Sequence, residues 1–173
     1  MKNKKILKNG SKLILSLVLL FFAVSTFAQR GGVNFSGNWS LNESGSELGE
    51  GRMRMTASNL VIKQDGNNLT IERTATRQGG GSSTSSEKYT LDGQSNVNTG
   101  AMNRQVASNV TWTDNSRTLT FRSAQKFERD GQSMEIKSTE IWSLSADGNI
   151  LTIDAVTSAQ QGEWKRKLVY NKK

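Results

Sequence analysis

The feature that most constrains this fold is an alternation of apolar and polar residues that runs from residue 35 to residue 170. Short segments place apolar side chains at every second position, as strands with one buried face do. Asp-Gly and Asn-rich pairs separate these segments and tolerate the positive φ angles of tight hairpins. Strands joined so closely must be antiparallel neighbours, so the pattern predicts a meander of about nine or ten strands. The predicted turns lie at 65–67, 92–93, 114–115, 130–131 and 147–149.

Two stretches interrupt the alternation and are predicted to be loops. Residues 42–51 are polar and rich in Gly and Glu, and residues 78–86 contain three consecutive glycines followed by serines. A glycine run can cradle phosphate, but no P-loop lysine follows this one and no helix is predicted after it. We therefore interpret 78–86 as a flexible connection, and no segment after residue 28 has a helical period.

An open sheet of this many strands would leave two edges unpaired and its apolar face in water. Closing the sheet removes both edges and buries that face. The sequence therefore predicts an all-β fold, an antiparallel up-and-down meander closed into a barrel of about 8–10 strands. An outer-membrane barrel is an alternative, but lipid-facing aromatic residues are sparse here and residues 170–173 do not end on an aromatic side chain.

The chain has no cysteine and no histidine. A disulfide scaffold, a thiol nucleophile and a thiolate metal site are therefore excluded. The missing imidazole removes the commonest general base and the commonest metal ligand. Glutamates are present, but no spacing pairs two of them as glycosidase carboxylates are paired, and no loop clusters acids for calcium. We expect no catalytic residue, no metal site and no cofactor, and hence no enzyme.

The first 28 residues have the three parts of a secretory signal peptide. Five lysines precede an apolar run over 13–24, and small residues precede a cleavage point between Ala28 and Gln29. The run has 12 residues, which is short for a permanent membrane-spanning helix and argues against an uncleaved anchor. We expect residues 1–28 to be removed, leaving 29–173 as one secreted or periplasmic domain without stable membrane insertion.

The formal net charge of +8 overstates the charge of the predicted mature domain. The predicted signal peptide holds five lysines and no acid, which leaves 18 basic and 15 acidic residues after it, a net charge of +3. A nucleic-acid-binding domain would concentrate its basic residues in a stripe. The densest basic group here is 165–167 with 172–173, as a solvated strand and tail would have, so we expect no nucleic-acid partner.

Residues 35–41, Phe-Ser-Gly-Asn-Trp-Ser-Leu, resemble the G-x-W signature in the first strand of lipocalin and fatty-acid-binding (calycin) barrels. The whole predicted mature chain resembles small secreted lipocalin-like domains of bacteria. This resemblance implies a lipocalin-like barrel in which Gly37 and Trp39 close one end, covered by a cation from 165–167. Where fatty-acid-binding proteins end in R-x-Y, residues 168–170 are Leu-Val-Tyr. The carboxylate-binding arginine is missing at that position, so the ligand class does not transfer.

Several polar residues share the phase of the core positions and are predicted to point into the barrel. An inward arginine beside an inward glutamate would form an internal salt bridge or bind a carboxylate or hydroxyl of a ligand. Alternatively, the strands extend past the barrel and these charges lie in water. Aromatic side chains in the same phase either fill the core or line a cavity. The candidate ligand-binding residues are Arg73, Tyr89, Trp112, Glu140, Trp142, Arg166 and Tyr170.

Two functions follow from a barrel of this size, because small barrels are either hollow or completely filled by side chains. A hollow barrel would carry a small apolar ligand against the aromatic candidates and Arg73. A filled barrel would serve as a protein-interaction or structural module of the cell envelope through the loops at 42–55 and 78–86. The sequence favours a secreted, non-catalytic carrier, with the module for a protein partner as the alternative.

Overall fold

A computed structural model gives the structure of this chain, and it describes residues 32–49, 56–76, 81–100, 103–129 and 131–173. The predicted signal peptide, 1–28, lies outside the described residues. The barrel belongs to one compact unit, Gly31–Lys173. Within the described ranges there is no helix with the length and hydropathy needed to cross a membrane.

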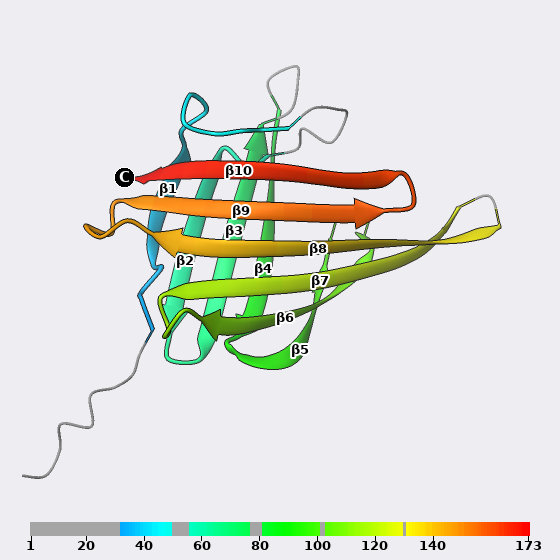
Figure 1. Ribbon diagram of the computed structural model, residues 1–173, viewed down its shortest axis with the longest axis horizontal. Helices are drawn as coiled ribbons and strands as arrows, with labels where there is room; N and C mark the ends of the chain where they lie inside the picture. The colour runs from blue at the N-terminus through cyan, green and yellow to red at the C-terminus, as the bar shows by residue number, and fades with distance from the viewer. Residues whose placement is uncertain (1–31, 50–55, 77–80, 101–102, 130) are drawn as a thin grey trace, which may run out of the picture. The chain divides into compact units, whose positions relative to one another are not determined.

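The described residues form one antiparallel sheet (Figure 1). Its strands are β1 (Gly37–Leu41), β2 (Asn59–Asp65), β3 (Asn68–Thr76), β4 (Ser82–Thr90), β5 (Asp92–Thr99), β6 (Gln105–Thr113), β7 (Thr118–Arg129), β8 (Gln132–Leu144), β9 (Ile150–Ala159) and β10 (Gly162–Lys172). The spatial order is β4-β3-β2-β1-β10-β9-β8-β7-β6-β5. The two edge strands, β4 and β5, follow each other in the chain, so the sheet curls into a nearly closed barrel. The predicted all-β meander is confirmed.

The hairpin turns have the backbone that the sequence predicts. Each of the five predicted turns contains at least one residue with a positive φ angle, as tight antiparallel connections require. These residues are Gly66, Gly93, Asp114 with Asn115, Gly131 and Gly148. Turn chemistry and the period-two pattern therefore act together to set the strand order.

Two predictions about the loops have different outcomes. The loop after β1 is found over 42–49, where Glu47 bridges to Lys167 of β10. The prediction that 78–86 is a loop is wrong from residue 82 onward, because Ser82–Thr90 is β4. The ladder to β3 imposes the extended backbone there, and small Ser and Thr side chains fit it without an apolar signal. Residues 50–55 and 78–80 of the predicted loops lie outside the described residues.

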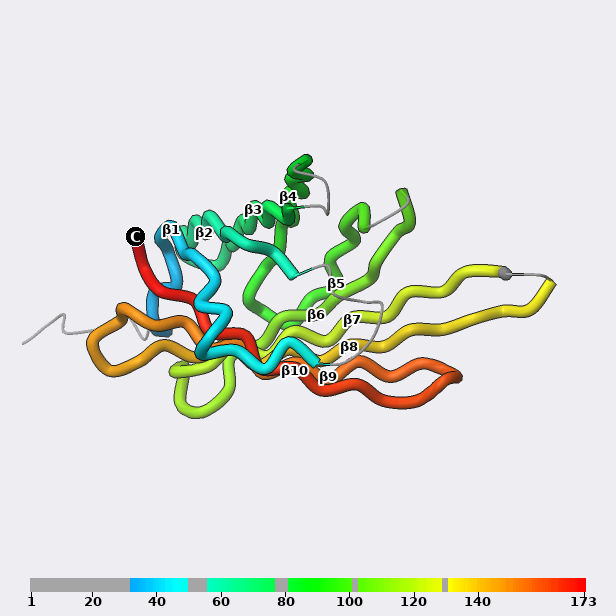
Figure 2. The backbone as a smooth tube through the Cα atoms, turned by 90° about the horizontal axis from the view of Figure 1, so that it is seen from above, coloured from blue at the N-terminus to red at the C-terminus, as the bar shows by residue number. Residues whose placement is uncertain are grey.

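The edge strands β4 and β5 lie at the two ends of the strand order, and their traces run apart in Figure 2. Side chains link them instead of a backbone ladder. The side-chain amide of Asn98 accepts from the backbone N–H of Lys88 at 2.8 Å and donates to its carbonyl at 2.9 Å. Asn96 Oδ1 accepts from the backbone N–H of Thr90 at 3.0 Å. These amides reproduce the donors and acceptors of a neighbouring strand, so part of the β4 edge is satisfied without closing the sheet.

The apolar core fills the end of the barrel where the β2–β3 and β6–β7 turns lie. Residues 32–36, which precede β1, cross this end: the backbone N–H of Val33 donates to the Ser116 carbonyl at 3.0 Å. The backbone N–H of Phe35 donates to the side chain of Gln64 at 2.9 Å, and the Phe35 ring is fully buried. The buried cluster contains Phe35, Trp39, Ala57, Leu60, Ile62, Leu69, Ile71, Tyr89, Leu91, Val110, Leu119, Phe121, Trp142, Leu151, Ile153, Leu168 and Tyr170.

Gly37 and Trp39 fix the start of the barrel. The Trp39 side chain is fully buried, and its Nε1–H donates to the Phe35 carbonyl at 3.1 Å. Gly37 has a φ of 154°, and a Cβ there would lie 3.0 Å from Lys172 Cε. The backbone conformation therefore favours glycine, and a Cβ would also have to displace the end of the Lys172 side chain. The cation over the Trp39 ring is Lys172, 5.3 Å from the ring centroid, so the prediction of 165–167 is wrong, because the β1–β10 register pairs Trp39 with Lys172.

Candidate ligand site in the barrel interior

Along several strands the inward side chains change from buried and apolar to partly exposed and charged. On β3, Leu69 and Ile71 are buried and Arg73 follows at the next inward position. On β8, Trp142 is buried and Glu140 is the next inward position toward the β7–β8 turn. The interior therefore has a packed half and a half that water reaches.

The two halves meet at a hydrogen-bonded group of five side chains, which we call the interior polar network. Arg73 Nε lies 3.0 Å from Glu87 Oε2, and Arg73 Nη2 lies 3.3 Å from Glu140 Oε2. Tyr89 Oη donates to Glu87 Oε2 at 3.0 Å, and Trp142 Nε1 donates to Glu140 Oε2 at 2.9 Å. The three charged side chains retain exposed fractions of 21–23%. The network is inside the barrel and still in contact with solvent.

The charges of the network stabilise one another. Burial lowers the pKa of Arg73, but the negative charges of Glu140 and Glu87 outweigh it and hold that pKa above its ordinary value. The guanidinium carbon of Arg73 also lies 5.3 Å from the centroid of the Trp142 ring, which adds a cation–π contact. Arg73 is therefore a fixed cation held by two carboxylates and an aromatic face.

Stacked aromatic rings form the floor beneath the network. The Trp142 ring lies 4.6 Å from the Phe121 ring, and Phe121 meets Tyr89 edge to face at 5.3 Å between centroids. Phe35 approaches Trp142 from the closed end at 6.4 Å. These distances lie within the range of favourable aromatic pairs, so the rings pack against one another beneath the network.

Above the network the inward side chains become small. The ladder registers place Ser108, Ser123, Ser138 and Thr157 in one row across β6 to β9, and the row ends at Trp164 of β10. Small hydroxyl side chains fill less of a barrel than the Leu, Ile and aromatic side chains of the packed half. The inward positions above the network are therefore occupied by smaller and more polar side chains than those of the packed half.

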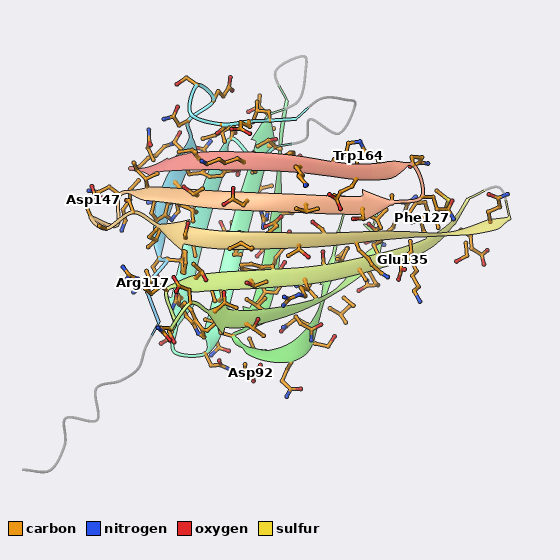
Figure 3. The ribbon with its side chains drawn as sticks, viewed as in Figure 1. Asp92, Arg117, Phe127, Glu135, Asp147 and Trp164 are labelled. Carbon is orange, nitrogen blue, oxygen red and sulfur yellow. The ribbon has the colours of Figure 1, made fainter. Side chains whose placement is uncertain are left out.

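Larger apolar side chains return near the far ends of the long strands. Phe127 of β7, with Met134 and Ile136 of β8, is half-buried on the inward phase, and Trp164 is 36% exposed. Figure 3 shows Phe127 and Trp164 at the end of the strands remote from the Asp147 turn. The half that water reaches thus has the interior polar network at its base, hydroxyl side chains along its walls and apolar side chains at its rim.

The structure brings four of the seven candidate residues into one network and separates the other three. Trp112 lies at the closed end, where its ring packs 6.2 Å from that of Phe35. The Tyr170 side chain is fully buried, and its hydroxyl donates to the Ala57 carbonyl at 2.9 Å. Arg166 is half-buried in the row of Glu140, two strands away. The four that meet are Arg73, Tyr89, Glu140 and Trp142.

Glu87 is the member of the network that the sequence interpretation omits. It lies two positions before Tyr89 and thus in phase with Tyr89 and Leu91. This phase is a usable signal in the sequence. However, a loop predicted over 78–86 puts Glu87 at the very start of the strand, where an inward residue looks the same as a solvated strand end.

The buried phenols predict an unusual alkaline titration. Tyr89 and Tyr170 are the two tyrosines of the chain. Burial and the charge of Glu87 raise the pKa of Tyr89, and burial raises the pKa of Tyr170 to about 12. The folded state therefore keeps protons that the unfolded state loses above its pKa of about 10, so stability falls as the pH rises beyond that value.

Ultraviolet absorbance of tyrosinate measures this directly. In the folded protein we expect no tyrosinate signal up to a pH of about 11, followed by ionisation that coincides with loss of structure by circular dichroism. In denaturant both phenols should ionise near a pH of about 10. Phenols that ionise near that value while the protein stays folded would contradict the burial described above.

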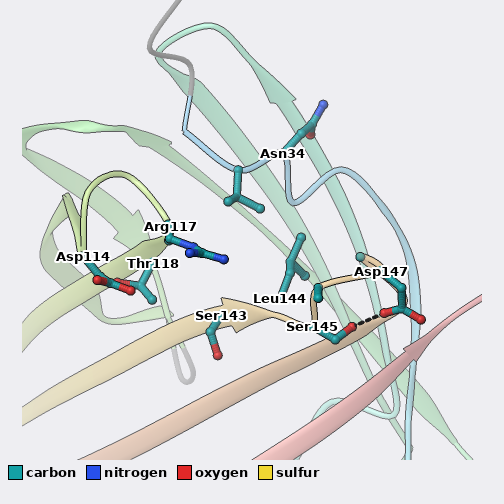
Figure 4. Close-up of a pocket in the computed structure, with 11 residues that line it drawn as sticks. Asn34, Asp114, Arg117, Thr118, Ser143, Leu144, Ser145 and Asp147 are labelled. Atoms are coloured by element: carbon teal, nitrogen blue, oxygen red, sulfur yellow. Dashed lines mark hydrogen bonds between the residues drawn. The ribbon is translucent and has the colours of Figure 1, made fainter.

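A concavity lies at the closed end of the barrel, between the β6–β7 and β8–β9 turns (Figure 4). It encloses about 490 Å³, and Arg117 points into it from the β6–β7 turn. Asp147, at the other side, already accepts hydrogen bonds from Ser145 Oγ and Asn149, which lower its pKa. The hydrogen bonds of Asp147 in this concavity thus stabilise the β8–β9 turn. The concavity is lined by Val33, Asn34, Asp114, Arg117, Thr118, Ser143, Leu144, Ser145, Ala146, Asp147 and Gly148.

One solved structure is similar to this chain over most of its length. The zebrafish ileal bile acid-binding protein complexed with cholic acid superposes with a TM-score of 0.50 at 14% sequence identity. The match covers 80% of this chain and 98% of the zebrafish protein. No protein-family model and no curated protein sequence matches the chain. Together with the ten-stranded, nearly closed antiparallel sheet, the similarity shows that the chain has the calycin barrel fold.

Proposed function

We propose that this protein is a non-catalytic, lipocalin-like binding protein that holds a small, largely apolar ligand in the half of its barrel that water reaches. The observation that carries the proposal is the interior polar network, whose charged side chains lie inside the barrel and still contact water. Charged groups inside a protein are costly unless they are paired or hydrated. Retaining them above a packed floor is what a binding site with one polar contact point requires.

The proposed ligand lies with its apolar body against the rim and its polar end on the network. Phe127, Met134, Ile136 and Trp164 offer the apolar contacts, and each buried methylene of the ligand would contribute about 0.8 kcal/mol. Ser123 and Ser138, on the walls between, offer hydroxyls for further polar groups. The zebrafish protein of the same fold was crystallised with cholic acid, which supports an amphipathic ligand of this general shape.

The proposal includes export from the cytoplasm. Residues 1–28 have the layout of a secretory signal peptide, and the chain lacks cysteine, so its fold does not depend on the redox state of its compartment. The mature protein would begin at Gln29 and work in the periplasm or outside the cell.

Mass spectrometry of the same sample in native and denaturing conditions tests both parts. The full chain is expressed in a bacterial host and purified from the extracytoplasmic fraction. We expect a denatured mass that corresponds to a chain beginning at Gln29, and a native mass that is larger by the mass of a bound small molecule.

Added probes test binding if no molecule is carried through purification. Dodecylamine and oleate, whose head groups carry opposite charges, are titrated while tryptophan fluorescence is recorded, because Trp142 is part of the network. A bare native mass together with unchanged fluorescence for both probes would overturn the carrier function and favour a protein partner. A denatured mass that retains residues 1–28 would overturn cleavage at Gln29 alone.

A further inference from the structure

We infer that the polar end of the ligand is a hydrogen-bond donor, and above all a cation such as an ammonium group, and that the site rejects a free carboxylate. This inference rests on the proposed function and specifies its ligand. It follows from the charge of the interior polar network and from which of its atoms are already used.

The network carries more negative than positive charge. Arg73 supplies one positive charge, and Glu87 and Glu140 supply two negative charges within 3.0 Å and 3.3 Å of it. An arginine that faces a ligand alone attracts carboxylates, but this arginine directs its Nε and Nη2 donors to glutamates. The remaining charge of the group is that of one carboxylate.

Both glutamates keep unused acceptor capacity. Arg73 uses two of its five N–H donors in these contacts, so the net negative charge of the network decides which head group is favoured. Arg73, Tyr89 and Trp142 direct four donor contacts at the two glutamates, and all four end on the Oε2 atoms. Within the described part of the chain, the Oε1 atoms of Glu87 and Glu140 receive no hydrogen bond from a protein donor. A carboxylate oxygen accepts about two hydrogen bonds, so both Oε1 atoms can accept from a ligand.

Among the described residues, further cations share the inward phase. Arg104 lies at the rim, with its guanidinium carbon 4.1 Å from the centroid of the Phe127 ring. Another is Arg166. It lies in the row of Glu140 with Ala155 between them, so two strand spacings of about 4.8 Å each separate their backbones. Its stem passes close to Gly49 of the loop after β1, where a Cβ would lie 3.2 Å from Arg166 Cγ. The electrostatic potential beside Glu87 and Glu140 is therefore set chiefly by the two glutamates and by Arg73, which contacts both.

Two ligands that differ chiefly in the head group separate the alternatives. Dodecylamine and dodecanoate both have twelve carbons, and at pH 7.5 one is a cation and the other an anion. The apolar chain of dodecylamine is one carbon longer, which accounts for roughly fourfold in affinity and no more. The net charge of the protein is positive, so unspecific attraction would favour dodecanoate. A preference for dodecylamine would therefore report the local charge of the site.

We expect delipidated protein to bind dodecylamine at least about tenfold more tightly than dodecanoate by isothermal titration calorimetry, because opposite charges attract and like charges repel in a partly water-excluded site. The double variant Glu87→Gln/Glu140→Gln leaves Arg73 as the charge of the network and should reverse the preference. The matched control Glu128→Gln/Glu135→Gln removes two glutamates from β7 and β8 that are out of phase with the interior, and should keep the wild-type order.

The outcomes distinguish this inference from the proposed function. If wild-type protein binds dodecanoate as tightly as or more tightly than dodecylamine, the inference is wrong and the carrier function stands. If neither probe binds, the carrier function fails and the inference fails with it. The comparison of the two ligands in wild-type protein needs no variant, so it remains a valid test if the double variant does not fold. In that case the single variant Glu140→Gln replaces the double variant, and a smaller change in the affinity ratio is expected.

Discussion

Replacing Arg73 with methionine should lower the free energy of unfolding by about 2–4 kcal/mol at pH 8. The change leaves Glu87 and Glu140 inside the barrel without the cation that both contact. Removing one partner of a deeply buried ion pair costs more, but these side chains keep about a fifth of their surface in solvent, which reduces the penalty. Denaturant unfolding, followed by circular dichroism, measures the loss.

The loss should depend on pH in a defined direction. Without Arg73, Glu87 and Glu140 are two like charges inside the barrel with no cation between them, and protonation at low pH relieves their repulsion and desolvation. Stability is then retained at low pH and lost as the pH rises and both carboxylates become charged. The Arg73→Met variant should therefore lose stability between a pH of about 5 and about 8, relative to wild type.

Two comparisons show whether the network causes this effect. Arg122→Met removes an exposed arginine from β7 and should change stability by less than about 0.5 kcal/mol. Adding Glu87→Gln and Glu140→Gln to Arg73→Met removes the unpaired charges and should abolish the pH dependence. The free energy of unfolding of Arg73→Met is therefore measured at about pH 5 and about pH 8. A loss of stability that is small and equal at these two pH values would contradict the role of the network as a coupled unit.

Replacing Trp142 with alanine should lower the free energy of unfolding by about 3–5 kcal/mol. The side chain is fully buried, packs 4.6 Å from the Phe121 ring and donates to Glu140. Its removal creates a cavity in the floor of the site and also removes a donor from Glu140. The same substitution should weaken binding of any ligand that rests on the network, because the floor no longer holds Glu140 in place.

The adjacent residue provides the matched control for Trp142. Ile141 is on the outward face of the same strand and is 44% exposed, so Ile141→Ala should cost about 1 kcal/mol or less. Trp142→Phe keeps an aromatic ring but not the indole N–H, and should give an intermediate loss. Equal losses for Trp142→Ala and Ile141→Ala would show that the packed half of the barrel is not organised as described.

Much of the fold is predictable because short stretches of the sequence specify the turns and the inward face of each strand. Turn pairs such as Asp65-Gly66 and Asp147-Gly148 mark where the chain reverses, and the period-two pattern of β8 and β9 marks the inward face. The same phase places Arg73 and Glu140 inside, and the structure joins them at 3.3 Å although 67 residues separate them. Alternate residues of every strand point into a barrel, so inward residues of strands far apart in the sequence share one interior.

Other features depend on pairing that no local pattern contains. β5 has one large apolar residue, Val97, and it is 62% exposed, so this strand is held by β6 and by the amides of Asn96 and Asn98. The β1–β10 register, which decides that Lys172 covers Trp39, is likewise a long-range property. The position of an aromatic residue along the barrel axis is also set by these long-range pairings. It places Tyr89 and Trp142 in the network and Trp112 at the closed end.

The most direct test of a ligand site above the interior polar network is the indole region of an NMR spectrum of isotope-labelled protein. The four tryptophans give four indole N–H signals, assigned by substitution. On titration with whichever of dodecylamine and cholate binds more tightly, we expect the Trp142 signal to shift, because its acceptor is Glu140 of the network. The Trp39 signal should stay in place, because its acceptor is the Phe35 carbonyl in the packed end. A bound ligand that shifts Trp39 and leaves Trp142 unchanged would contradict a site in the half of the barrel that water reaches.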